Sequence, residues 1–130
     1  MSCLPLVARL NGGDASPSAR QIVDKELSAV ESEVLGVVET MPAAEFDFAP
    51  TQGALGSVRP FGGQARHIMF CLHEVATARL GKPMPPHTDQ EGPRNLTTKE
   101  DVVRYLKDAF AEAHRAIGTL TNANLLERTT

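Results

Sequence analysis

Prolines divide this chain into three stretches in which apolar residues recur every three or four positions. Pro42 ends the first stretch, Pro60 precedes the second, and four prolines in residues 82–95 separate the second from the third. Apolar residues at this spacing share one face of an α-helix, whereas proline lacks the backbone N–H donor that a helix interior needs. The pattern therefore predicts an all-α protein with three main helices.

The first helix is expected over residues 17–41. Ser16 offers an oxygen to the first free amides, and Pro17 has the fixed φ that suits a first helical turn. Pro42 ends the helix, because the residue before a proline is driven out of the helical region. One buried face is predicted from the apolar positions Ile22, Val23, Leu27, Val30, Val34, Val37, Val38 and Met41.

The second and third helices are expected over residues 61–80 and 98–121. Gly81 can adopt the left-handed conformation that closes the second helix. Thr97 and Glu100 have the spacing of a capping box at the start of the third. Residues 1–16 are expected to form a flexible N-terminal segment, and residues 17–126 to form one helical domain.

The segment between the first two helices, residues 42–60, shows no sustained period and is expected to be an ordered loop. Three phenylalanines in or beside it, Phe46, Phe48 and Phe61, are expected to pack under the end of the bundle. Residues 82–95 are expected to form a surface loop, because four prolines leave too few donors for a helix.

Composition and charge exclude some classes of function. The 130 residues are 42% hydrophobic and 22% charged, as in a soluble globular domain, and a net charge of −3 without a basic cluster argues against nucleic-acid binding. No apolar run approaches the roughly 18 residues of a membrane span. Cys3 and Cys71 lie in a loose terminal segment and on a helix face, so no disulfide is expected. The first residues lack a signal-peptide pattern, and we expect a cytoplasmic protein.

His67, in the second helix, is the strongest candidate for a functional residue. At the helical pitch, Cys71 and Glu74 lie about 40° and about 20° around the axis from it, on the same face. All three residue types bind zinc. His67 and Cys71 could share one tetrahedral ion, whereas Glu74, about 10 Å further along the helix, would reach it with difficulty. The alternative is structural: a packed histidine beside a small buried thiol.

The other histidines are expected to have structural roles. His73 points away from His67 and is expected at the surface or its boundary, and His87 lies in the proline-rich loop. His114 is expected at the edge of the apolar face of the third helix. It would face His67 only if the third helix ran antiparallel to the second at matching height. No Ser, Thr or Cys lies in a recognisable nucleophile motif.

Three segments, in this order, resemble the DinB family of YfiT-like helical proteins. They are the exit from the first helix (residues 41–50, MPAAEFDFAP), the entry to the second (residues 59–64, RPFGGQ, followed by His67) and the opening of the third (residues 96–102, LTTKEDV). The resemblance covers residues 21–126. It implies an up-down-down-up four-helix bundle that holds a divalent metal, commonly nickel or zinc. The implied ligands are a histidine on the second helix, here His67, and a His-x-x-x-His pair on the fourth.

The resemblance stops before the fourth helix. We therefore expect a DinB-like bundle with three main helices and an apolar groove, which favours self-association; a homodimer that completes the bundle in trans is one outcome. Because one histidine gives no chelate, Cys71, Glu74, His114 or a second chain is expected to contribute to any metal site. The implied function is that of a metal-dependent hydrolase or thiol-dependent transferase, impaired by the missing helix, with an unspecified small-molecule substrate. The alternative is a non-catalytic helical interaction and oligomerisation module.

Overall fold

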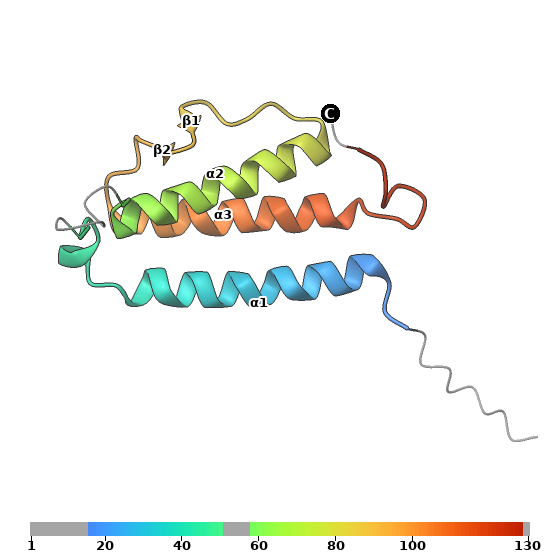
Figure 1. The fold of residues 1–130 in the computed structure, drawn as a ribbon, viewed down its shortest axis with the longest axis horizontal. Helices are drawn as coiled ribbons and strands as arrows, with labels where there is room; N and C mark the ends of the chain where they lie inside the picture. The colour runs from blue at the N-terminus through green and yellow to red at the C-terminus, as the bar shows by residue number, and fades with distance from the viewer. Residues whose placement is uncertain (1–15, 51–57, 129–130) are drawn as a thin grey trace, which may run out of the picture.

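Three long helices make up most of the chain. The computed structural model describes residues 16–50 and 58–128, in which α1 spans Ala19–Thr40, α2 Phe61–Leu80 and α3 Lys99–Gly118 (Figure 1). A short 3-10 helix, η1, covers Ala43–Glu45, and the two-residue strands β1 (Thr88–Asp89) and β2 (Gly92–Pro93) form an antiparallel pair. The all-α prediction is confirmed, with this strand pair as an addition. The segment predicted to be flexible, residues 1–16, lies outside the described residues except for Ser16.

The helix starts differ slightly from those expected. Ser18, not Ser16, caps α1: its hydroxyl accepts a hydrogen bond from the Gln21 amide, and the Gln21 side chain accepts one from the Ser18 amide. This reciprocal pair satisfies two of the free amides and places the helix start at Ala19. Thr98, not Thr97, caps α3 through the amide of Asp101. Gly81 closes α2 in the left-handed conformation, with φ of 64°, as expected.

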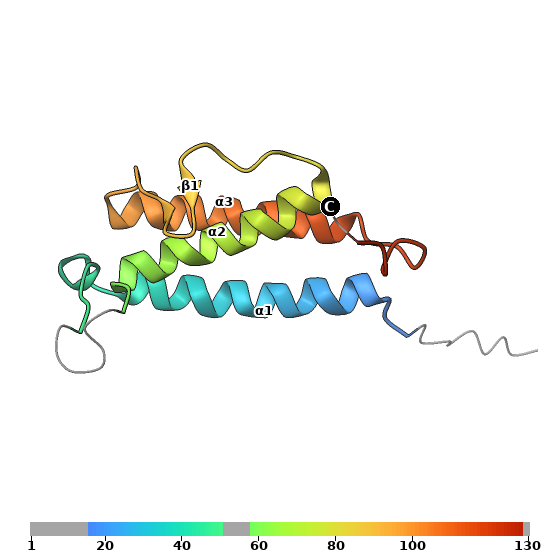
Figure 2. The same cartoon turned by 45° about the horizontal axis from the view of Figure 1, so that its top comes forward.

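The helices α2 and α3 run in the same direction, and α1 runs opposite to both (Figure 1). Two parallel helices cannot be joined by a short turn. The chain therefore returns along the outside of the bundle through residues 81–98, which carry the β1–β2 hairpin (Figures 1 and 2). The packing is unequal: α3 packs against both α2 and α1, whereas α1 and α2 make no contact of comparable extent.

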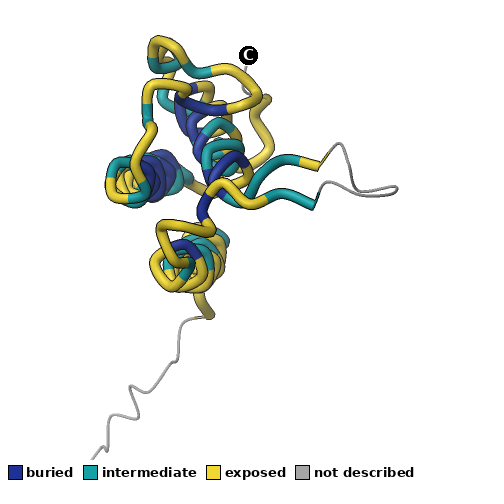
Figure 3. The backbone as a smooth tube through the Cα atoms, turned by 90° about the vertical axis from the view of Figure 1, so that its left-hand side faces the viewer, coloured by how far each residue is buried: buried dark blue, intermediate teal, exposed yellow. Residues whose placement is uncertain are grey.

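The core lies mainly between α2 and α3. Met69 of α2 and Leu106 and Phe110 of α3 are fully buried. In contrast, α1 contributes one buried residue, Val38, and its tube is mostly coloured as exposed in Figure 3. None of the helices in the described ranges has both the length and the apolarity needed to cross a membrane.

The prediction that α1 buries its whole apolar face was wrong. Ile22, Val23, Val30 and Val37 are between 43% and 58% exposed. The physical reason is that α3 covers one side of this face, while the side turned toward α2 has no helix packed on it. The molecule therefore carries an exposed apolar surface along α1.

Two of the three phenylalanines expected under the end of the bundle are there. Phe46 is buried and contacts Phe61 edge to face, with ring centroids 5.6 Å apart. A Cβ at Gly62 would overlap the Phe46 ring, so this close contact depends on a glycine. The prediction for Phe48 was wrong, because its side chain is 62% exposed.

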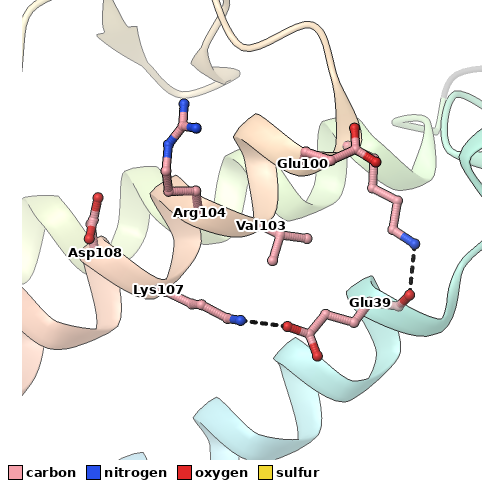
Figure 4. Close-up of a pocket in the computed structure, with 7 residues that line it drawn as sticks. Glu39, Glu100, Val103, Arg104, Lys107 and Asp108 are labelled. Carbon is pink, nitrogen blue, oxygen red and sulfur yellow. Dashed lines mark hydrogen bonds and ion pairs between the residues drawn. The ribbon is translucent and has the colours of Figure 1, made fainter.

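Lysines of α3 hold the C-terminal end of α1. Lys99 donates to the backbone carbonyls of Glu39 (2.7 Å) and Met41 (2.6 Å), where the helix leaves carbonyl oxygens without intrahelical partners. Lys107 pairs with the Glu39 carboxylate at 2.7 Å (Figure 4). The hollow drawn in Figure 4 is bordered by these charges, which fix α1 on α3.

Candidate metal centre

An apolar groove opens between α1 and α2, with the C-terminal half of α3 behind it. Its volume is about 630 Å³. We call this surface the groove. Its apolar lining comes from α1 (Val23, Leu27), from α2 (Ile68, Leu72, Val75, Ala76) and from α3 and the turn after it (Ala113, Ala116, Ile117, Leu120). Its polar members are Gln64, His67, Cys71 and Arg79.

His67 and Cys71 form a donor pair in this groove. They are one helical turn apart on α2, and the His67 Nε2 lies 3.8 Å from the Cys71 Sγ. Zinc binds histidine nitrogen at about 2.0–2.1 Å and thiolate sulfur at about 2.3 Å, which at a tetrahedral angle places the two donors ~3.6 Å apart. The observed separation is close to this value. The two side chains therefore fit as ligands of one tetrahedral ion.

The orientation of the His67 ring is set by the loop that crosses α2. The backbone carbonyl of Gln90 lies 2.5 Å from Nδ1. Because a carbonyl only accepts, Nδ1 carries the hydrogen and donates it, and in the neutral ring Nε2 keeps its lone pair. A histidine held in this way by a carbonyl is the usual arrangement behind a metal-binding Nε2.

Two contacts hold Gln90 over His67. Gln90 and Glu91 form the turn of the β1–β2 hairpin, and the next residue, Gly92, has φ of 76°. A Cβ at Gly92 would collide with the backbone carbonyl of Arg66, so only glycine permits this approach to α2. Arg59, just before α2, donates to both oxygens of the Glu91 carboxylate at 3.0 and 3.2 Å. This hydrogen-bonded pairing raises the pKa of Arg59 and lowers the pKa of Glu91.

Glu74 and His114 lie apart from the His67–Cys71 pair. Glu74 is exposed two turns along α2 from His67. His114 faces α1, where its Nδ1 lies 2.7 Å from Asp24 and its Nε2 lies 3.1 Å from Glu31. Because α2 and α3 are parallel, His114, in the C-terminal part of α3, also lies further along the bundle than His67, in the N-terminal part of α2 (Figure 1). In residues 16–50 and 58–128, no three His, Cys, Asp or Glu side chains form a group that could hold a metal ion.

The carboxylates around His114 favour its charged form. The hydrogen bond to Asp24 raises the pKa of His114; partial burial opposes this, and Glu31 adds to the rise. With a carboxylate on each ring nitrogen, both nitrogens act as donors in the protonated ring. His114 therefore serves as a link between α3 and α1.

His73 is buried, so the prediction that it lies at the surface or its boundary was wrong. Its side chain is covered by α3: Nδ1 lies 2.9 Å from Glu112, and its ring packs edge to face on Tyr105. The Glu112 carboxylate also accepts from Lys82 at 3.3 Å. Burial raises the pKa of Glu112, but the bonds from His73 and Lys82 together lower it below its usual value.

Sequence reasoning missed two parts of this region. The Gln90 carbonyl is a backbone atom in an irregular loop, and no side-chain pattern marks it. The His73–Glu112 pair had a weak signal, since both are ionisable residues beside apolar helix positions. The direction of α3, which decides what each of its faces meets, could not be read from its own periodicity.

Comparison with known proteins gives a family but no individual relative. No curated protein and no solved structure matches the chain. A family model described as the DinB superfamily matches residues 26–130, which include all of α2 and α3 and most of α1. The matched residues include His67. The chain therefore belongs to the DinB superfamily.

Proposed function

We propose that this chain is a divalent-metal-binding DinB protein, with His67 as a metal ligand and Cys71 as a second donor. The observation that carries the proposal is the orientation of His67: Gln90 occupies Nδ1, and Nε2 lies 3.8 Å from a thiol in an apolar groove. A nitrogen and a sulfur donor favour zinc or nickel over magnesium or calcium.

The groove supports a reaction of the hydrolase or thiol-transferase class on a small molecule. A divalent metal bound at this site would supply Lewis-acid activation of a water or a thiol. The chain's own residues have other roles: Gln90 orients His67, and the apolar lining excludes water and accepts an apolar part of a substrate. The net charge of the groove lining is small, so a strongly charged substrate is not favoured.

Elemental analysis of protein purified without a histidine tag tests the proposal. We expect zinc or nickel in the wild-type chain and its loss in His67→Ala, with an unchanged circular dichroism spectrum. His87→Asn is the matched control, because it removes an exposed loop histidine and asparagine tolerates the left-handed φ of 61° found there. Equal metal content in all three proteins would exclude His67 as the ligand.

A second candidate function is a non-catalytic helical interaction module. The exposed valines of α1 favour it, because a wide apolar surface marks a site for another protein surface. The two functions differ in a measurable way. An interaction module associates equally well after His67→Ala, whereas a metal-dependent function is lost.

A further inference from the structure

The groove holds half of a tetrahedral donor set. His67 and Cys71 provide one nitrogen and one sulfur, and the part of the chain that the structure describes brings no third ionisable ligand to them. Two donors on one helix bind an ion weakly, whereas a structural zinc site takes four. A two-fold symmetric partner would contribute an identical pair and complete the set.

The surface around the pair is suited to such a partner. On α2, Gln64, Ile68, Cys71 and Val75 follow each other at spacings of four, three and four residues, which makes one continuous stripe. The side chain of Val75 is 70% exposed and Cys71 is exposed as well. Cys71 lies within the stripe, between Ile68 and Val75. Two copies of α2 crossing there would therefore bring their Cys71 and His67 side chains together.

A second apolar stripe runs along α1 and reaches the groove at one end. Val23, Val30 and Val37 lie seven residues apart on this helix and are 43%, 49% and 58% exposed; of these three valines, Val23 lines the groove. A spacing of seven keeps these side chains on one side of the helix along most of its length. A helix placed in the groove would thus bury apolar side chains of both α1 and α2.

The charges in the groove also permit self-association. In a two-fold interface each surface meets its own copy, so an unpaired charge at the centre would face a like charge. The one permanent cation in the lining, Arg79, lies near the end of α2 and donates to Thr119 at 3.1 Å. The lining contains no carboxylate. The centre of the stripe, at Ile68 and Cys71, therefore carries no charge, and the exposed Glu74 carboxylate on this side of α2 lies outside the lining.

We propose that the occupant of the groove is a second copy of this chain, and that one zinc-class ion joins the two copies through two His67 and two Cys71 side chains. This inference rests on the metal-binding part of the proposed function, because it needs His67 to bind metal. An ion with four protein ligands has no open position for a water or a substrate, so the shared ion joins the two copies structurally and does not itself supply the Lewis-acid chemistry. The ion would be held by two nitrogens and two thiolate sulfurs, with the thiol protons released on binding.

Zinc titration of the tag-free, 130-residue Cys3→Ser chain tests this site. Light scattering gives the mass and elemental analysis gives the bound zinc. We expect the mass to rise from that of the 14.0 kDa chain to twice that value, with one zinc for each two chains. Cobalt in place of zinc should give a thiolate-to-metal charge-transfer band in the near ultraviolet.

Cys71→Ser should abolish the charge-transfer band and leave the chain monomeric, without unfolding it, because Cys71 is exposed. Asp108→Asn, an exposed position on α3 outside the groove lining, is the control and should change neither the charge-transfer band nor the mass. One zinc per monomeric chain, dependent on His67, would overturn the shared site and leave the proposed function standing. One zinc per monomer would also result if a helix from another part of a longer chain supplied the remaining ligands. No zinc binding at all would overturn both, and a dimer that forms equally without zinc or in Cys71→Ser would overturn the shared site.

Discussion

The backbone of Gly92 lies against the carbonyl of Arg66, and this contact brings the hairpin turn onto His67. The orientation of the His67 ring thus depends on a glycine outside the His67–Cys71 pair. A turn residue with positive φ and no room for a Cβ is a position that only glycine fills without strain. Among residues outside the candidate site, Gly92 therefore has the clearest effect on the orientation of His67.

Gly92→Ala should weaken both stability and metal binding. The added Cβ forces the turn away from α2, which costs about 1–3 kcal/mol of unfolding free energy. Loss of the Gln90 carbonyl should reduce metal affinity about 10- to 100-fold. Urea unfolding and a competitive zinc chelator measure the two effects. Gly36→Ala is the control, because a Cβ there meets nothing within 4 Å, and it should stabilise α1 by up to about 1 kcal/mol.

His114 should make stability depend on pH. Its pKa is raised in the folded chain, so its link to Asp24 and Glu31 is fully present below the unfolded value of about 6.5 and is lost as pH rises through the folded value. Arg20 and Arg115 border the same site, and their charge is constant over this range.

The measurement for His114 is urea unfolding of wild type and His114→Gln over a series of pH values. We expect the wild-type advantage to be largest below the unfolded value of about 6.5, where Asp24 and Glu31 are still ionised, and to decline as the pH rises above it. If the stability difference between wild type and His114→Gln stays constant across this range, protonation of His114 does not strengthen the contact between α3 and α1.

At the scale of the elements, α2 and α3 are joined by a buried polar contact as well as by apolar packing. His73 lies between the helices with Nδ1 on Glu112, while its Nε2 has no hydrogen-bond partner among the described residues. Removing the carboxylate would leave both ring nitrogens unpaired in a buried place, which is more costly than losing a surface ion pair.

Glu112→Ala should therefore destabilise the chain by about 1–3 kcal/mol. Asp108→Ala, an exposed change one turn earlier on the same helix, should alter stability by no more than about 0.5 kcal/mol. Chemical denaturation of the two variants gives the comparison. Equal effects of the two substitutions would mean that the His73–Glu112 contact adds nothing to the packing of α2 on α3.

The elements with long apolar periods were predictable, and the parts that depend on tertiary contacts were not. Apolar spacing with proline and glycine at the ends indicated all three helices, and the four-residue spacing of His67 and Cys71 indicated their common face. The two-residue strands β1 and β2 have no period to detect. The burial of His73 and the pairing of His114 with α1 follow from the parallel course of α2 and α3 (Figure 1), which the helix periodicities do not contain and which only the up-down-down-up order implied by the family resemblance indicated.

At the scale of the whole molecule, the uneven packing of three helices is the main feature. The α2–α3 pair contains most of the core, α1 is fixed to α3, and the groove remains open on the side between α1 and α2. Apolar side chains such as Val23 and Val75 are exposed there to an extent that a closed bundle would not permit.

Val75→Lys should weaken self-association while leaving the stability of the fold nearly unchanged. Because this side chain is 70% exposed, the substitution should change the unfolding free energy by no more than about 0.5 kcal/mol. In a two-fold interface it would place a charge in the apolar stripe, so self-association should fall at least about tenfold, as for a loss of about 1.4 kcal/mol. Sedimentation velocity over a concentration series measures it. Unchanged association would place the interface elsewhere on the molecule.

The limited contact between α1 and α2 has a consequence for local unfolding. Segments with few buried apolar contacts open with less free energy than the core, and their amide hydrogens exchange with solvent sooner. The amides of α1 should therefore exchange before those of α2 and α3, which remain together as one cooperative unit. Whatever fills the groove would add contacts to α1. Binding of an occupant in the groove would therefore slow amide hydrogen exchange along α1, a helix that carries neither His67 nor Cys71.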